Sequence, residues 1–125
     1  MYRKRPKHLN LMEINLPLPA VISILHRVSG VLLFFPGIPI LLYSLQMMLD
    51  SPQSHDEFHE ILTCLPVRCA LIILLWSLMH HLCAGIRHLA LDLHYGIELE
   101  QARISSRLVF VAGAILTILF GAAIW

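Results

Sequence analysis

Charged residues are scarce in this sequence. Only 14% of its 125 residues are Asp, Glu, Lys or Arg, whereas 58% are hydrophobic. A soluble domain has about a quarter charged residues and about half apolar residues. The composition therefore excludes an ordinary soluble domain and predicts one small membrane domain.

The sequence is also poor in cysteines and in sorting signals. Cys64, Cys69 and Cys83 have neither a zinc-site spacing nor a secreted disulfide pattern, so we expect small apolar side chains in or near helices. The opening MYRKRPKHLN leads into an apolar run that is too long for a signal peptide, and it lacks the Ser-rich character of a transit peptide. We therefore expect a protein of the bacterial inner membrane, or one that is already processed. No internal repeat or low-complexity segment is evident.

Three long apolar stretches are the main feature of the chain. They cover about residues 21–49, 65–91 and 108–125, each near or above the ~20 residues that a helix needs to cross the hydrocarbon core. The sequence predicts an all-α membrane protein with three transmembrane helices (residues 21–125), preceded by a segment of residues 1–20. Pro36 and Pro39 should kink the first helix. The connection DSPQSHDEFHE is polar and acidic, and DLHYGIELEQARISSR has the composition of a short amphipathic helical turn.

Lys and Arg are distributed unequally between the two ends of these helices. The connection between the first two stretches has no Lys or Arg before Arg68 and is acidic instead. The basic residues at the other end are Arg3, Lys4, Arg5, Lys7, Arg103 and Arg107. Cytoplasmic segments are enriched in Lys and Arg, so we expect residues 1–20 and the second connection to be cytoplasmic.

Polar residues interrupt the second stretch at helical spacing. His81, Gly85, His88 and Asp92 follow one another at i, i+4, i+7 and i+11, which places them on one narrow face of a helix. Gly85 leaves a gap on this face, where a flat ligand or another helix can approach the backbone. Arg87 points elsewhere, near the cytoplasmic end, where it can reach the interface or an acidic partner.

The first stretch carries a matching polar group. Ser23 and Arg27 are an i, i+4 pair, and His26 and Gly30 form a second pair beside it. An intramembrane arginine costs about 2.5–3.5 kcal/mol on insertion scales, and such residues generally face the bundle interior at functional sites. Arg27 should lie just inside the cytoplasmic boundary, and His81, seven residues before His88, should lie roughly 10 Å deeper than His88. This arrangement suits a haem on edge, with Arg27 at the propionates and His81 at the iron.

Simpler explanations exist for each polar residue. His81 is equally compatible with a hydrogen bond between helices, and spacing does not exclude its neighbour His80 as a ligand. Ser23 can bond to its own helix, and simple solvation explains His88 and Asp92. Four further histidines lie in polar segments and should be solvated, namely His8, His55, His59 and His94.

Two segments resemble a known family, the large cytochrome b-type membrane anchor subunit of succinate dehydrogenase (complex II). The first is RPKHLNLMEINLPLPAVISILHRVSG, which has the family's Arg-Pro and Ser-Ile-Leu-His-Arg-x-[Ser/Thr]-Gly elements. The second is HLCAGIRHLALD, which fits His-x-x-x-Gly-Ile-Arg-His-x-x-x-Asp. The resemblance covers essentially the whole chain, although the acidic connection and the third stretch match only in character.

The resemblance implies roles for individual residues. His81 would be an axial ligand of haem b, which favours it over His80. His26 and Arg27 would neighbour the haem propionates, and Ser23 and Arg27 would line the ubiquinone site.

Further roles implied by the resemblance lie near the same pocket. Leu11 and Leu16 correspond to apolar positions beside the quinone, and Asp92 to a position suited to proton delivery. Arg87 and His88 would be supporting residues.

The function that the resemblance implies is electron transfer rather than chemistry on succinate. A flavoprotein subunit would oxidise succinate, an iron–sulfur subunit would relay the electrons, and ubiquinone would receive them in the respiratory chain and the tricarboxylic acid cycle. Because only one strong axial ligand candidate is present, the second would come from a smaller three-span anchor subunit. No nucleic-acid partner is expected.

Other functions compete with this one. A fumarate reductase anchor has the same architecture and works in the opposite direction, and the motif pair favours the succinate-oxidising type. A cofactor-free membrane scaffold predicts that His81 has only a packing role. A small ion or proton carrier needs a polar route across the bilayer, and the outer half of the second stretch, CALIILLWSL, offers none.

Overall fold

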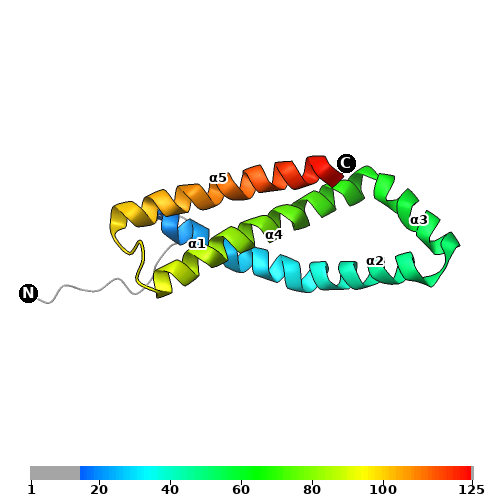
Figure 1. Cartoon of the computed structure of the whole chain (residues 1–125), viewed down its shortest axis with the longest axis horizontal. Coiled ribbons are helices and arrows are strands. Elements are labelled where there is room, and N and C mark those ends of the chain that lie inside the picture. Colours follow the sequence, from blue (N-terminus) through cyan, green and yellow to red (C-terminus); the bar gives the residue numbers. More distant parts are fainter. Residues whose placement is uncertain (1–14, 125) are drawn as a thin grey trace, which may run out of the picture.

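The computed structural model describes residues 15–124, which form helices joined by short turns (Figure 1). The elements in chain order are α1 (Leu18–Leu32), the π-helix η1 (Leu33–Gly37), α2 (Ile38–Asp50), α3 (Pro52–Thr63), α4 (Leu65–Asp92) and α5 (Leu99–Ile124). Three helical segments are long and apolar enough to cross a membrane, and they span 33, 28 and 26 residues. The predicted all-α fold with three such helices is therefore confirmed. Leu11, in contrast, lies outside the described residues.

The first long helix continues through its two prolines. Pro36 has no N–H group, and the backbone around it widens into the five-residue π-turn η1, which the Ile38 N–H closes by donating to the Leu33 carbonyl. Pro39, which also lacks an N–H group, lies at the start of α2, directly after this widened turn. The disturbance is thus a local π-turn within one continuous helical segment, the setting in which π-helices mostly occur.

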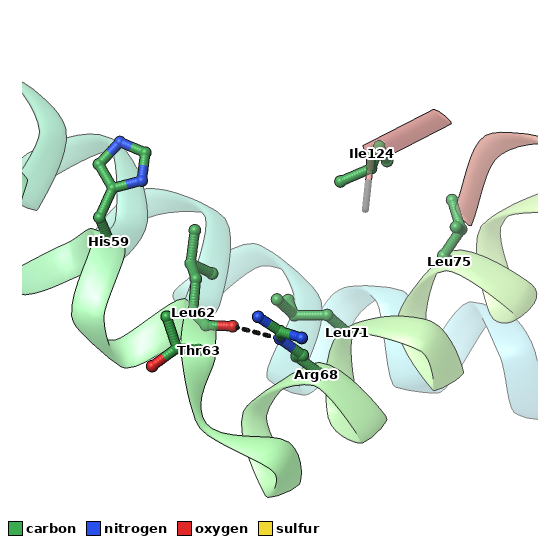
Figure 2. Close-up of a pocket in the computed structure, with 7 residues that line it drawn as sticks. All are labelled: His59, Leu62, Thr63, Arg68, Leu71, Leu75 and Ile124. Carbon is green, nitrogen blue, oxygen red and sulfur yellow. Dashed lines mark hydrogen bonds between the residues drawn. The ribbon is translucent and has the colours of Figure 1, made fainter. Parts of the chain in front are cut away.

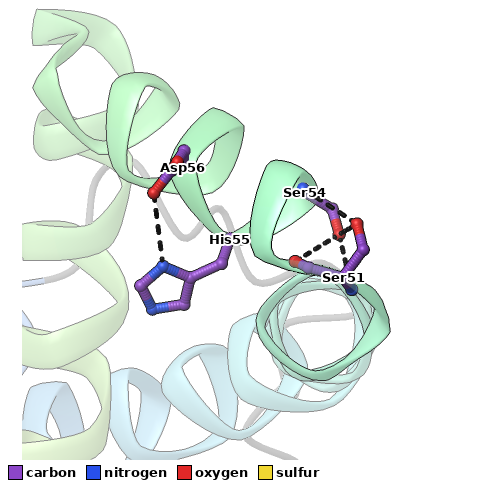
Figure 3. Close-up of polar contacts among 4 residues, drawn as sticks. All are labelled: Ser51, Ser54, His55 and Asp56. Carbon is purple, nitrogen blue, oxygen red and sulfur yellow. Dashed lines mark hydrogen bonds and ion pairs between the residues drawn. The ribbon is translucent and has the colours of Figure 1, made fainter.

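The acidic connection folds into helix α3, although the sequence had predicted no secondary structure for it. Ser51 caps it reciprocally with Ser54 (Figure 3): the Ser54 N–H donates to the Ser51 hydroxyl at 3.1 Å, and the Ser51 N–H donates to the Ser54 hydroxyl at 3.0 Å. Pro52 occupies the first turn, where its fixed φ suits a helix. In the next turn, His55 Nδ1 lies 3.7 Å from the exposed carboxylate of Asp56.

The last helix begins earlier than the apolar stretch does. It starts at Leu99 rather than near Leu108, because the polar segment LEQARISSR continues the helix beyond its apolar part. The hydroxyls of Ser105 and Ser106 both donate to the Ala102 carbonyl within this segment. The preceding turn reverses the chain with His94 and Gly96 at positive φ, 64° and 75°.

Helix α4 is the centre of the packing. It contacts both α1 and α5, which also contact each other, while α2 diverges from it and α3 connects α2 to the start of α4 (Figure 1). Ile22, Ala84 and Val109, one from each of the three long helices, form the small buried core. Most other large apolar side chains are exposed, including Phe35 at 74% and Leu49 at 76%, as expected for helices whose outer surfaces meet lipid or other membrane subunits.

Candidate functional site

The side chain of His81 is held by two oxygen atoms of α1. Its Nδ1 lies 3.1 Å from the Ser29 hydroxyl oxygen and 3.1 Å from the His26 carbonyl oxygen. The Ser29 hydroxyl in turn donates to the same His26 carbonyl at 2.8 Å. One turn of α1 thus supplies both partners of the Nδ1 atom.

This geometry assigns the proton of the neutral His81 imidazole. A carbonyl oxygen only accepts hydrogen bonds, and the one proton of the Ser29 hydroxyl is already donated to His26. Nδ1 therefore carries the hydrogen and donates it to both oxygens, and Nε2 keeps a free lone pair. Nε2 makes no hydrogen bond with residues 15–124, so the ring is prepared to bind an electrophile at that atom.

Two further histidines pack against this ring. The His26 imidazole stacks on His81 with ring centroids 4.2 Å apart and an interplanar angle of 19°. The His88 ring lies 5.0 Å from His26 at a tilt of 42°. His88 is therefore half-buried between α1 and α4 rather than simply solvated.

Two glycines make room for these rings. A Cβ on Gly30 would lie 3.0 Å from Cε1 of His81, and a Cβ on Gly85 would lie 3.6 Å from Nε2 of His26. The gap predicted at Gly85 is thus filled by the His26 side chain of the neighbouring helix. His26 Nε2 is buried there without a hydrogen-bond partner among the described residues.

His80 faces a different helix from His81. It is fully buried between α4 and α5, where it stacks on Trp76 at 5.1 Å and lies 5.9 Å from the Phe110 ring. Its Cα and backbone N lie against Gly113 of α5. Neither ring nitrogen has a hydrogen-bond partner within residues 15–124. The two adjacent histidines therefore belong to different helix interfaces.

Arg87 also belongs to the α4–α5 interface. Its Nε donates to the Ser105 hydroxyl at 3.0 Å, and an NH2 group reaches the Ala102 carbonyl at 3.5 Å. The side chain is only 8% exposed. Within residues 15–124 the partners of Arg87 are thus neutral oxygen atoms of α5 rather than an acidic side chain.

The predicted quinone-site residues lie on less buried surfaces. Arg27 is exposed and forms no ion pair with residues 15–124, and Leu16 is 40% exposed just before α1. Ser23 is half-buried, and its hydroxyl does not bond to a carbonyl of its own helix. Asp92 is exposed at the end of α4. Ser23 and Arg27 continue along α1 to Gly30 at i+7, which places them on the edge of the helix that contacts His81.

A cavity lies well away from these residues. It has a volume of about 490 Å³, is mostly apolar, and lies between α3, the start of α4 and the end of α5 (Figure 2). Its lining residues are His59, Leu62, Thr63, Arg68, Leu71, Leu75 and Ile124. Arg68 is oriented there by donating from Nε to the Leu62 carbonyl at 2.9 Å. In the described part of the chain, no group of three or more His, Cys, Asp or Glu side chains is arranged to hold a metal ion by itself.

Ser29 is the site residue to which the sequence had assigned no role. It is fully buried, and it contacts a side chain 52 residues further along the chain. Its position three residues after His26 and directly before Gly30 was the available signal, because these residues share a turn of helix. Spacing within α1 could not indicate which residue of α4 would meet it.

The fold and this site define a class of protein, a multi-pass membrane protein with histidines packed between two of its helices. Comparison with known proteins makes the class specific. Residues 1–120 match the family described as the succinate dehydrogenase/fumarate reductase transmembrane subunit. The chain therefore belongs to this family, as a complex II cytochrome b anchor subunit.

Individual relatives agree with the family match. The succinate dehydrogenase cytochrome b556 subunit of Coxiella burnetii is 38% identical over 126 residues, which cover all of both chains. The protein of the same name from Rickettsia felis is 32% identical, over 95% of this chain and 92% of the relative. The one from Paracoccus denitrificans is 33% identical, over 92% of this chain and 88% of the relative.

Proposed function

We propose that this chain binds one haem b together with a smaller membrane anchor subunit and helps to form a ubiquinone-reduction site. In this role it passes electrons from succinate oxidation to quinone, in the respiratory chain and the tricarboxylic acid cycle. The observation that carries the proposal is the His81 imidazole, whose Nδ1 donates to α1 and whose Nε2 makes no hydrogen bond within residues 15–124. A family that includes cytochrome b subunits supports the same assignment.

The residues around His81 fit a haem ligand. Iron-binding histidines generally donate their second ring N–H to a carbonyl or another acceptor, which fixes the tautomer and increases the basicity of the ligating nitrogen. Haem b would supply a one-electron carrier beside the quinone site. His26 and Arg27 would pair with its propionates, with the fixed cation of Arg27 as the stronger partner.

Quinone binding is proposed for the less buried edge of α1. Ser23 would donate its hydroxyl proton to a quinone oxygen, and Arg27 would stabilise negative charge that develops on the ring. Leu16 and, from outside the described residues, Leu11 would contact the apolar part of the molecule. Asp92 would deliver protons from the same side.

The surroundings of the chain follow from this role. Its partners would be a flavoprotein subunit, an iron–sulfur subunit and the smaller anchor, which would supply the second haem ligand. We propose a bacterial inner membrane location with residues 1–20 in the cytoplasm, because the basic residues gather on that side. The names of the relatives favour succinate oxidation over fumarate reduction.

The haem assignment is tested with two adjacent histidines. Membranes that contain the complete complex are compared by reduced-minus-oxidised visible spectra for the native chain, His81→Leu and His80→Phe. We expect a b-type spectrum that is lost or strongly altered in His81→Leu and retained in His80→Phe, since His80 faces α5. A native complex without haem, or a spectrum unchanged by His81→Leu, would leave the cofactor-free scaffold as the better explanation.

The quinone site is tested separately with Arg27→Leu and, as a control, Arg68→Leu. Arg27→Leu should reduce succinate–quinone activity at least tenfold while electron transfer from succinate to a soluble dye is unchanged, because one charge-assisted interaction with developing charge is worth about 1.5–3 kcal/mol. Arg68, beside the distant cavity, should have little effect on either rate. Equal losses in the two variants would refute the assignment.

A further inference from the structure

We propose that Ser29 is a positioning residue for His81: its hydroxyl oxygen holds the Nδ1 edge of the imidazole and thereby tunes the ligating nitrogen. This inference rests on the proposed haem function. It assigns Ser29 a role that goes beyond packing, although the residue itself would not touch the haem.

The orientation of the Ser29 hydroxyl is fixed by a hydrogen bond within its own helix. The residue is fully buried in α1, and its proton is donated to the His26 carbonyl at 2.8 Å. The hydroxyl oxygen therefore presents a lone pair in a defined direction, and the Nδ1 atom of His81 lies 3.1 Å from it. Because the His26 carbonyl lies equally close to Nδ1, the two oxygens share one N–H group.

The opposite orientation of the ring would lose these contacts. The Nδ1–Cε1 edge of His81 faces α1, since Nδ1 contacts Ser29 and Cε1 lies at the Gly30 position. Turning the ring over would exchange Nδ1 for a carbon and break both hydrogen bonds. The hydroxyl and the carbonyl therefore select one ring orientation and one tautomer.

Two other buried serines show that burial alone does not create this arrangement. Ser77 and Ser106 are also fully buried, and each donates to a carbonyl four residues back, at 2.8 and 2.7 Å. Within residues 15–124 neither hydroxyl is hydrogen-bonded to a histidine. They are matched controls, because their removal deletes the same atom and the same kind of backbone hydrogen bond.

A hydrogen bond donated by Nδ1 changes how strongly the other ring nitrogen donates electrons to iron. An acceptor at Nδ1–H increases the electron density of the imidazole, which favours ferric over ferrous iron. One hydrogen bond is worth about 0.5–1.5 kcal/mol, which corresponds to a two- to tenfold change in that equilibrium. Ser29→Ala should therefore raise the haem midpoint potential, by up to about 59 mV for a tenfold change with one electron.

The experiment compares purified complexes that contain Ser29→Ala, Ser77→Ala or Ser106→Ala. The readouts are the haem midpoint potential by spectroelectrochemistry and the low-spin ferric EPR signal, which reports on ligand orientation. We expect both to change in Ser29→Ala only, and Ser29→Thr, which keeps the hydroxyl, to restore them. If Ser29→Ala fails to assemble, Ser29→Cys tests the same bond with a weaker acceptor and should shift the potential in the same direction.

The possible failures are distinguishable. If the native complex has a haem that depends on His81 but Ser29→Ala matches the two control serines, the positioning role is overturned and the proposed function stands. Equal assembly defects in all three alanine variants would also overturn it, in favour of simple packing. If the native complex has no haem that depends on His81, the proposed function itself fails, and the positioning role fails with it.

Discussion

Replacing Gly30 by alanine should disturb His81 specifically. The new Cβ would lie 3.0 Å from Cε1 of His81, whereas carbon atoms in contact are about 3.5–4.0 Å apart. The ring would have to move by about 0.5 Å away from α1. That movement would lengthen the two Nδ1 contacts from 3.1 Å to about 3.6 Å, beyond a useful hydrogen bond.

The expected loss of stability follows from two opposing effects. Overpacking of this kind costs about 1–3 kcal/mol. Alanine in place of glycine within a helix recovers about 1 kcal/mol. The net change should thus be a destabilisation of about 0–2 kcal/mol, with a disproportionate effect on haem binding of about 10–100-fold, as is typical when the supporting contact of a metal ligand is disturbed.

Gly121→Ala is the matched control for this experiment. Its new Cβ would meet a side-chain carbon of Leu75 at 3.9 Å, an ordinary contact. We would measure the thermal denaturation midpoint of the detergent-solubilised complex and its haem content per protein. Gly30→Ala should lose haem and Gly121→Ala should not. Identical haem contents would refute the geometry deduced for His81.

Three further predictions concern other parts of the chain. His80→Phe should leave the free energy of unfolding unchanged or raise it by about 1 kcal/mol, because it removes two buried nitrogens that have no hydrogen-bond partner among the described residues. A drop above about 2 kcal/mol would contradict the interface described for His80. Arg87→Met should lower the denaturation midpoint of the complex through the lost bonds to Ser105 and Ala102, worth about 1.5–3 kcal/mol together, and retention of the native midpoint would show that these bonds contribute no net stability. Ser51→Ala should remove the α3 cap at a cost of about 0.5–2 kcal/mol, seen as faster amide exchange confined to α3, and unchanged exchange would exclude the capping role.

Several of the fold's features could be predicted from the sequence because they depend on local rules. A helix must cross a hydrocarbon layer of nearly fixed thickness, so apolar runs of suitable length indicate where the long helices lie. The sequence did not predict that the last helix begins at Leu99, because the first residues of this helix are polar and do not continue the apolar run. Helix α3 was left open for a related reason: its cap pairs two serines, a weaker sequence signal than a Ser followed by Glu or Gln.

The candidate site could likewise be predicted only in part from local rules. The helical repeat by itself put His81, Gly85 and His88 on one face of α4, and the resemblance to the family implied a haem-ligand role for His81, which stays a prediction. The repeat also separates His80 from His81 by about 100°, but it does not say which neighbouring helix lies in either direction. Only the packing of α4 between α1 and α5 decided this.

The tertiary structure likewise decided what surrounds each polar group. It placed the Ser29 hydroxyl and the His26 carbonyl at Nδ1 of His81, and it directed Arg87 to Ser105 on α5. Helical spacing acts over a few residues, whereas these contacts join residues between 18 and 55 positions apart. The sequence alone therefore determined which residues are polar within the membrane-spanning helices. The three-dimensional packing determined their partners, because a buried polar group is stabilised by whichever donor or acceptor the neighbouring helix brings within hydrogen-bond distance.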